Sequence, residues 1–559
     1  MKTIAYMNLL LIFLNIGLIF SSKCGADKLK VKLKPVKDTK KIKRMKISES
    51  NANSLTPLKI GFDFTTLKKP SSMSSSVFNT VTSLLKDTRD EFSKLLRVSH
   101  QNYDLDDYIQ DIIEVCEVYT IGKDYRNFLV KNDLIIFPQF VNEYYLGEGV
   151  LAAAAPCIID YSNLRPIGGI LYINSDLNFG IKNTEAYVKQ LLIHEMTHIL
   201  VFHPYFFEYL GLSETKNSMS YITSDKVLAQ AKKHYGCDNF PFPGVPLEDQ
   251  GGEGSVGSHW ESRYMLGDYM VSTDFPDSAI SDITLALFED SGFYKVNYYS
   301  GGLFKFGKNE GCEFLTEDCI VNKKARFDEF CDVEDEPKCS ISRTIKSSCY
   351  LVNYQSSIPY KYRYFGNSTY GGFWAANYCP VPLDYTSGAY EYDFFPNHCL
   401  YGTSSGAYGE TIGENSYCFM SSLSLTDTSS SPVCYQVECD STNQQIKVTV
   451  GSGTVTCPTE GGMLTLSPLK GSIECPKYSD VCNTNDNIVC NDMFNCIDKY
   501  AENDESVTCY DYSGDTFDVE EYYYDNYDYF DYYDYYLESF NIKLNSFLLI
   551  LFGFILVFN

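Results

Sequence analysis

Three of the seven histidines in the chain fall within ten positions, inside the stretch QLLIHEMTHILVFHP at residues 190–204. In a helix, side chains four positions apart project from one face, so His194 and His198 could bring two imidazole nitrogens to one metal ion. Glu195 projects about 100° further round the same axis, where its carboxylate could act on a water molecule without being a ligand. The pattern H-E-x-x-H is a signature of zinc peptidases, and the alternative is a helix that merely carries two ordinary histidines.

A catalytic zinc site needs three protein ligands and one open position, so a third ligand must be found. His203 is one candidate, but the short metzincin motif places its third histidine six positions after the second, where this chain has Pro204. That motif also has a glycine at the position of Val201, and a β-branched residue resists the positive φ of a tight turn. We favour His259, in the glycine-rich stretch LEDQGGEGSVGSHW, and keep His203 as the alternative. The remaining histidines are interpreted as ordinary surface or core residues: His100, His234 and His398.

The elements that would position these residues can be placed from local patterns. Asn183 and Thr184 can cap a helix and Pro204 cannot continue one, which predicts a helix over most of residues 183–203. Helical spacing of apolar residues also predicts helices within 75–96 and 278–294. Short apolar runs bounded by turn residues, NDLIIFPQF and GGILYIN, predict strands. The mixture indicates an α+β fold.

Composition narrows the class of protein. A chain of 559 residues is long enough for several domains, and its net charge of -26 disfavours nucleic-acid binding, because it would repel phosphate. Twenty cysteines favour an oxidising, secretory compartment. Sixteen of them lie between Cys312 and Cys509, so the second half is expected to be rich in disulfides and loops.

The ends of the chain read as processing and attachment segments. Residues 1–22 have the layout of a secretory signal peptide, with a short membrane anchor as the alternative, and the basic residues 23–56 resemble a pro-segment or a linker. Residues 483–545 include an acidic, tyrosine-rich stretch that we interpret as a stalk. The uncharged tail 546–559 would span only about 21 Å as a helix, which favours a lipid-anchor signal over a short membrane anchor. Asn367, in FGNSTY, is a candidate N-glycosylation site.

Five blocks of the sequence, in the same order, resemble blocks of the leishmanolysin family of surface metalloendopeptidases. They are AAPCIIDYSNLRPIGGILYIN, VLAQAKKHYGC, VPLEDQGGEGSVGSHWESR, ISDITLALFEDSGFYKVNY and GCEFLTEDC. The resemblance covers roughly residues 57–480. It implies a metzincin-type zinc protease module over 57–300, with a long insertion before the third histidine, followed by a cysteine-rich domain over 301–482.

The resemblance also assigns roles to residues. His194, His198 and His259 would bind one Zn²⁺ per chain, Glu195 would be the catalytic acid and base, and Met270 would lie below the ion in the Met-turn. Proteins or peptides would be the substrates. The chain departs from the family at Val201, where glycine is usual, so the helix could run on to Phe202.

The stretch SKCGADKLK is similar to the family's pro-segment motif, with Cys24 followed at three positions by Asp27. A thiolate from Cys24 could fill the open zinc position and hold a precursor inactive, and the alternative is an ordinary cysteine. Without Cys24 nineteen cysteines remain, an odd number, so one thiol would be free or paired outside the chain. The competing functions are a surface adhesion protein on a protease scaffold, or a structural zinc protein.

Overall fold

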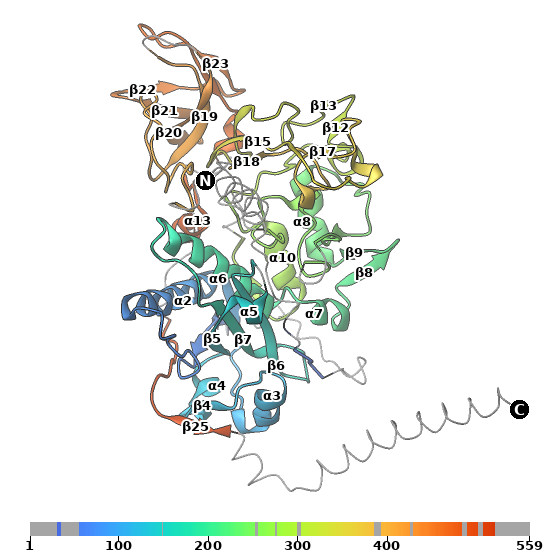
Figure 1. Cartoon of the computed structure of the whole chain (residues 1–559), viewed down its shortest axis with the longest axis vertical. Coiled ribbons are helices and arrows are strands. Elements are labelled where there is room, and N and C mark those ends of the chain that lie inside the picture. The colour runs from blue at the N-terminus through green and yellow to red at the C-terminus, as the bar shows by residue number, and fades with distance from the viewer. Residues whose placement is uncertain are drawn as a thin grey trace, which may run out of the picture.

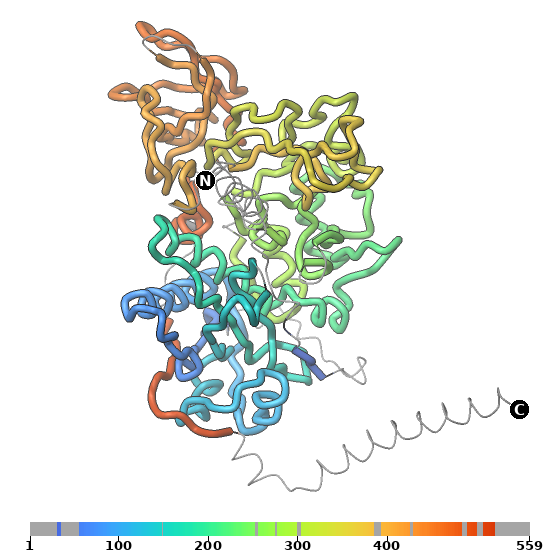
Figure 2. The backbone as a smooth tube through the Cα atoms, in the orientation of Figure 1, coloured from blue at the N-terminus to red at the C-terminus, as the bar shows by residue number. Residues whose placement is uncertain are grey.

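Figure 1 shows the computed structural model of the chain, and Figure 2 traces its backbone from the N-terminal to the C-terminal residues. The structure describes residues 29, 31–34, 55–147, 149–251, 255–273, 277–298, 303–384, 393–424, 429–482, 489–500 and 507–519. The predicted signal peptide (1–22), Cys24 and the apolar tail (546–559) lie outside the described residues.

A four-stranded mixed sheet forms the centre of the N-terminal half. Its strands are β2 (Ile60–Phe62), β5 (Leu134–Val141), β7 (Pro166–Asn174) and β6 (Ala152–Ile159), in that spatial order. The first three run parallel, and β6 pairs with β7 in the opposite direction. All residues of β6 and β7 are buried, which agrees with the continuous apolar runs typical of a sheet that is covered on both faces.

Different helices cover the two faces of this sheet (Figure 1). Residues alternate along β5, so that Leu134 and Ile136 belong to one apolar core and Ile135 and Phe137 to another. The first core includes α2 (Ser75–Leu95) and α6 (Thr184–Leu200), and the second includes α3 (Ile109–Glu114) and α4 (Phe128–Lys131). Because a Cβ on Gly169 would lie 2.5 Å from Cγ2 of Ile199, glycine lets α6 lie directly against β7.

The helices begin and end close to the predicted positions. Ser74 caps α2, and Ser281 caps α10 (Asp282–Asp290), each through a side-chain oxygen that accepts a backbone N–H. Asn183 stands at the N-cap of α6, but its side chain makes no cap there, contrary to the prediction. Its φ of 62° turns the amide away, and Nδ2 donates to Asp393 instead.

Smaller elements complete the N-terminal half. Three short strands form one sheet: β1 (Thr56–Pro57), β3 (Leu96–Val98) and β11 (Lys295–Val296). Three more form another: β8 (Ser213–Lys216), β9 (Met219–Ile222) and β10 (Val245–Pro246). The remaining helices here are α5 (Glu143–Leu146), α7 (Pro204–Tyr209), α8 (Asp225–Tyr235) and α9 (Ser262–Met265).

The C-terminal half consists of loops, short strand pairs and one larger sheet. The short strands are β12 (Ile320–Val321), β13 (Lys324–Ala325), β14 (Pro337–Cys339), β15 (Lys346–Cys349), β16 (Val352–Asn353), β17 (Tyr370–Gly371) and β18 (Pro382–Leu383). The six-stranded antiparallel sheet has the order β22 (Gly453–Thr456), β21 (Gln445–Val450), β20 (Ser431–Asp440), β19 (Ser416–Ser421), β24 (Ile473–Cys475) and β23 (Gly462–Leu464). Short helices α11 (Glu313–Thr316), α12 (Tyr478–Val481) and α13 (Met493–Tyr500) accompany them.

Disulfides are concentrated in this half, as the sequence predicts. The pairs are Cys116–Cys157, Cys237–Cys312, Cys319–Cys379, Cys331–Cys349, Cys339–Cys418, Cys399–Cys434, Cys439–Cys482, Cys457–Cys475 and Cys490–Cys496. Among the described cysteines, Cys509 alone is not in a disulfide. The mixed helices and sheets with a disulfide-rich C-terminal region confirm the predicted fold class.

The last described residues return to the N-terminal sheet, in red near α4 in Figure 1. Strand β25 (Thr516–Asp518) pairs with β4 (Thr120–Gly122), and Tyr512 forms backbone hydrogen bonds with Phe62 and Phe64 beside the edge strand β2. Residues 489–500 and 507–519 are therefore folded onto the body, whereas the sequence analysis placed them in a stalk. An edge strand with unpaired backbone groups recruits such a segment. In the described part of the chain, no helix combines the length and apolarity needed to span a membrane.

Candidate metal centre

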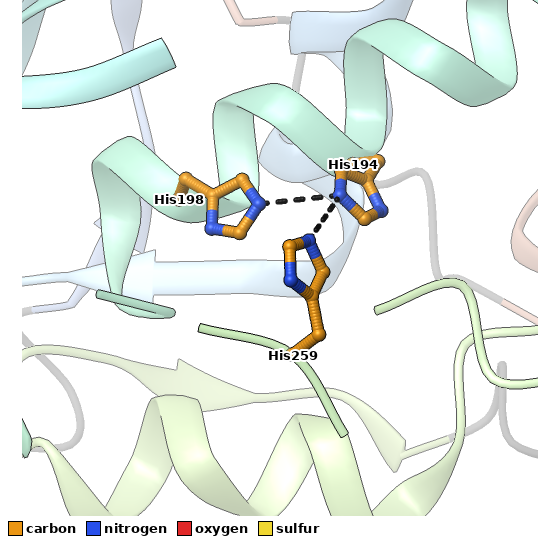
Figure 3. A group of neighbouring side chains, drawn as sticks. All are labelled: His194, His198 and His259. Carbon is orange, nitrogen blue, oxygen red and sulfur yellow. Dashed lines mark hydrogen bonds between the residues drawn. The ribbon is translucent and has the colours of Figure 1, made fainter. Parts of the chain in front are cut away.

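Two of the three clustered histidines lie on α6 and the third comes from a distant loop (Figure 3). The Nε2 atom of His198 is 3.2 Å from that of His194, and the Nε2 atom of His259 is 3.3 Å from the same atom. All three side chains are buried, with exposed fractions of 4% or less. The structure therefore brings His259, rather than His203, to the pair on the helix.

Backbone hydrogen bonds on both sides of His259 hold its loop in place. The carbonyl oxygen of His259 accepts from the N–H of Glu248, 2.9 Å away, at the point where β10 ends. The next residue, Trp260, donates its backbone N–H to the carbonyl of Met270 at 3.0 Å. Its indole N–H donates to Thr284 of α10, and the ring is wholly buried, so Trp260 packs in the core below the loop.

Each of the three imidazoles uses its other ring nitrogen to contact a backbone carbonyl. Nδ1 of His194 lies 2.6 Å from the oxygen of Tyr269, Nδ1 of His198 lies 2.7 Å from that of Phe202, and Nδ1 of His259 lies 3.1 Å from that of Ser255. A carbonyl can only accept, so each Nδ1 carries the proton and donates it. The three Nε2 atoms are left with lone pairs that point at one another.

This arrangement fits a metal ion better than hydrogen bonding among the rings. Three lone pairs at 3.2–3.3 Å repel one another unless a cation lies between them. Two nitrogens bound at about 2.1 Å to a tetrahedral zinc ion would be about 3.4 Å apart, close to the observed spacing. The group can thus hold a metal ion through three nitrogens and leave further positions open.

The electrostatic environment also keeps the imidazoles of His198 and His259 neutral. Burial, followed by the charge of the neighbouring His194, lowers the pKa of His259 to about 3. Burial, followed by the charges of His194 and His259, holds the pKa of His198 well below its usual value. Neutral imidazole is the form that binds metal, so the site needs no deprotonation near pH 7.

Glu195 and Met270, the other two predicted site residues, are both fully buried. Glu195 directly follows His194 on α6 and is fully buried. Met270 is buried in a turn that begins at Gly267, whose φ is 88°, and Asp268 holds that turn by accepting the N–H of Met270 at 2.8 Å. The turn lies against the helix, because its residue Tyr269 is the one whose carbonyl accepts from His194.

The end of α6 explains how the chain manages without a glycine at Val201. The helix stops at Leu200, and Val201 has a φ of -160°, so the exit from the helix does not need the positive φ that favours glycine. This exit presents the carbonyl of Phe202 to His198. His203 then caps α7, since its Nδ1 accepts the N–H of Tyr205 at 3.2 Å, and Pro204 takes the first helical position.

The other histidines have separate environments. His100 pairs with Asp133 at 2.8 Å, His234 contacts the carbonyl of Phe306 at 2.8 Å, and His398 accepts the N–H of Leu400 at 3.0 Å. The sequence analysis missed the carbonyls of Tyr269, Phe202 and Ser255, because any residue type supplies a carbonyl and no sequence pattern marks it.

Three acidic residues lie close together next to the loop that carries His259. Glu248, Asp249 and Glu261 have carboxylate oxygens within 4.8 Å of one another. Burial raises the pKa of Glu248 to about 7, and burial together with the charge of Glu248 raises the pKa of Glu261 further above its usual value. Glu261 also accepts from Asn377 at 3.0 Å, which ties this loop to the C-terminal half.

The fold and the site together define a peptidase-type metal centre, in which two histidines come from a helix and one from a remote loop. The family model described as leishmanolysin, peptidase M8, matches residues 80–488, well over half of the chain, and the chain belongs to the leishmanolysin family.

Individual members of the leishmanolysin family are similar to this chain in sequence. A leishmanolysin homolog of Crithidia fasciculata is 29% identical over 381 residues, which cover 62% of this chain and 55% of the relative. Leishmanolysin of Leishmania major is 29% identical over 381 residues, covering 62% and 60%. The leishmanolysin-like peptidase of Drosophila melanogaster is 28% identical over 302 residues, covering 47% and 44%. The chain thus spans about half of the length of these relatives.

Proposed function

We propose that the protein is a zinc-dependent metalloendopeptidase that cleaves peptide bonds within proteins. The observation that carries this proposal is the convergence of three neutral imidazole Nε2 atoms, with a glutamate next to the first of them on the helix. Three nitrogen donors at this spacing suit zinc, and a fourth position stays open for chemistry. A structural zinc site would instead be closed by four ligands and would not need the glutamate.

In this proposal His194, His198 and His259 hold the ion, and the carbonyls that accept from their Nδ1 atoms keep each ring oriented. A zinc ion bound by these residues would supply an activated water and a Lewis acid for the scissile carbonyl. Glu195 accepts the proton from the attacking water and then passes it to the leaving amine. Because Glu195 is buried, bulk solvent would screen its electrostatic interactions with the water and the leaving amine only weakly.

The test is to measure bound zinc and hydrolysis of a protein substrate for the wild-type chain and for Glu195→Gln, both without residues 1–56. Glutamine has the same shape and cannot accept the proton, so hydrolysis should fall by about 10²–10⁴-fold while bound zinc is unchanged. A Glu195→Gln protein that cleaves at the wild-type rate would refute the assignment. Full zinc without cleavage by the wild type would favour the alternative function, a surface adhesion protein on a protease scaffold.

We also propose that residues 23–56 act as an inhibitory pro-segment, with Cys24 as a ligand that blocks the open metal position. The described part of this segment supports docking: Leu33 packs against both apolar cores, and Nζ of Lys34 lies 2.8 Å from Asp111. The hydroxyl of Tyr205, on the helix just after α6, donates to the carbonyl of Lys34 at 3.3 Å. The segment therefore lies near the end of the helix that carries the candidate ligands.

Precursor protein with Cys24→Ala should show activity without cleavage, and Asp111→Asn should weaken the docking and speed activation. Lys32→Ala is the matched control, because Lys32 is exposed and makes no ion pair among the described residues. Equal latency of the Cys24→Ala and wild-type precursors would remove the thiol from this role.

We further propose that the protein is secreted to the cell surface, where residues 546–559 direct attachment to the membrane and a role in adhesion accompanies proteolysis. Asn367 is exposed in a polar turn, which suits a glycan acceptor. A mass shift on glycosidase treatment that Asn367→Gln abolishes would test the glycan. Release of the protein from cells by a phospholipase would test the lipid anchor.

A further inference from the structure

A cavity of about 400 Å³ lies away from the metal centre, beside strands β19 and β24 of the six-stranded sheet. Its lining comes from the segment after α10, from β14 and the turn that follows it, and from β19, β24 and α12. None of its lining residues belongs to the metal centre. Acidic and basic side chains line it in similar numbers, among them Lys305, Glu329, Arg343, Glu474, Lys477 and Asp480.

The most buried acid of this cavity has an unused oxygen. The side chain of Glu329 is 4% exposed, and its Oε1 accepts the backbone N–H of Gly307 at 2.9 Å. Its Oε2 is buried and has no hydrogen-bond partner within the described residues. A buried carboxylate oxygen without a partner costs on the order of 1–3 kcal/mol, so a donor is expected to reach it.

The basic residues of the cavity are also incompletely paired. Lys305 is 9% exposed and donates to the carbonyl of Ser479 at 3.1 Å. Arg343 lines the cavity and is partly exposed, and in the part of the chain that the structure describes its guanidinium makes no hydrogen bond or ion pair. Its φ is 59°, a left-handed conformation that costs a non-glycine residue about 1–2 kcal/mol. The turn thus holds this arginine at the cavity despite the strain.

Glu329 and Arg343 do not satisfy each other, although both face one cavity. Burial raises the pKa of Glu329 to about 7, and burial lowers the pKa of Arg343, with Asp480 and Glu474 acting in the opposite direction. The unpartnered oxygen of Glu329 is buried and the guanidinium of Arg343 is only partly exposed, so a ligand with both charges would pair with both groups.

We propose that this cavity binds a zwitterion with a free ammonium and a free carboxylate, either an amino acid or a short peptide. The carboxylate binds the guanidinium fork of Arg343, which matches its geometry in two parallel hydrogen bonds. The ammonium donates to Oε2 of Glu329. A cavity of about 400 Å³ is within the size range of small-molecule sites, and a di- or tripeptide fits that range. This inference goes beyond the proposed peptidase activity and does not require it.

Calorimetric titration of the full chain tests the proposal, with Glu195→Gln present throughout so that peptides are not cleaved. The probes are glycine, triglycine, N-acetyl-triglycine and triglycine amide. We expect triglycine to bind at one site, and Arg343→Gln and Glu329→Gln each to weaken it at least 10-fold. Lys216→Gln, an exposed lysine on β8, is the control and should leave the affinity unchanged.

The blocked peptides show which end each residue binds. N-acetyl-triglycine should bind weakly and be insensitive to Glu329→Gln, whereas triglycine amide should be insensitive to Arg343→Gln. Equal binding of glycine and triglycine would identify the ligand as a free amino acid. If Arg343→Gln fails to fold, Arg343→Lys keeps the charge but loses the fork, and should still weaken binding.

Two results would overturn the proposal. One is the absence of any heat with all four probes at millimolar concentration, which would leave water as the occupant. The other is binding that neither Arg343→Gln nor Glu329→Gln alters, since this would place the peptide at the metal centre or elsewhere.

Discussion

Replacing His259 by alanine tests the remote ligand, on which the whole proposed centre depends. In the structure the Nε2 atom of His259 is 3.3 Å from that of His194, so the ring supplies one of three donors around a single point. Loss of a residue that merely orients a ligand costs roughly 10–100-fold in metal affinity. Loss of the ligand itself should exceed 100-fold, which corresponds to more than about 2.7 kcal/mol.

The assay compares zinc per chain after dialysis against a chelator with the rate of hydrolysis of a protein substrate. His259→Ala should lose both. His203→Asn is the matched control, because asparagine can still cap α7 and His203 lies outside the group of three. Full zinc and full activity in His259→Ala would refute the reasoning, and so would loss of both in His203→Asn.

Three further predictions concern the frame around the site. Asp511→Ala removes the carboxylate that binds the guanidinium of Arg89 at 2.6 Å, so unfolding should become easier by about 2 kcal/mol in urea, and protease should cut residues 507–519. Asp515→Ala breaks only an exposed pair and should change neither. His398 is 1% exposed, and burial lowers its pKa to about 3. As the pH falls, the unfolded chain therefore binds a proton at this residue before the folded chain does, and the free energy of unfolding decreases. His398→Asn should remove about 2 kcal/mol of the loss between pH 7 and pH 5, measured by unfolding at both values, and an unchanged slope would contradict this. Tyr269→Phe should cost about 1 kcal/mol of stability and leave zinc bound, because the carbonyl that orients His194 remains.

Errors of the sequence analysis are physically informative. Asn183 was expected to cap α6, but tertiary contact with Asp393 competes for the same amide. The acidic, tyrosine-rich composition near the C-terminus suggested a solvated stalk from residue 483 onward. Composition is an average over a segment, so it could not predict that Asp511 and Tyr512 form hydrogen bonds with the edge strand β2 and the residues after it.

Local pattern alone determined the parts of the protein that depend on neighbours in sequence. The helical repeat places His194 and His198 on one face because 3.6 residues make a turn, and this holds wherever the helix lies. Apolar runs predicted β5 and β7, since strands that are buried on both faces consist largely of apolar residues. The positions of the cysteines predicted a disulfide-rich C-terminal half, because sixteen of the twenty lie between Cys312 and Cys509.

Tertiary structure decided everything that joins distant segments. Spacing left His203 and His259 both open, and only packing of the loop against β10 and the turn at Met270 brings His259 to the helix. Tertiary packing also decides which carbonyls orient the imidazoles and which cysteines pair. It likewise brings together the charged residues that line the cavity beside β19 and β24. These contacts have no sequence period, because they follow from which surfaces meet when the apolar cores close.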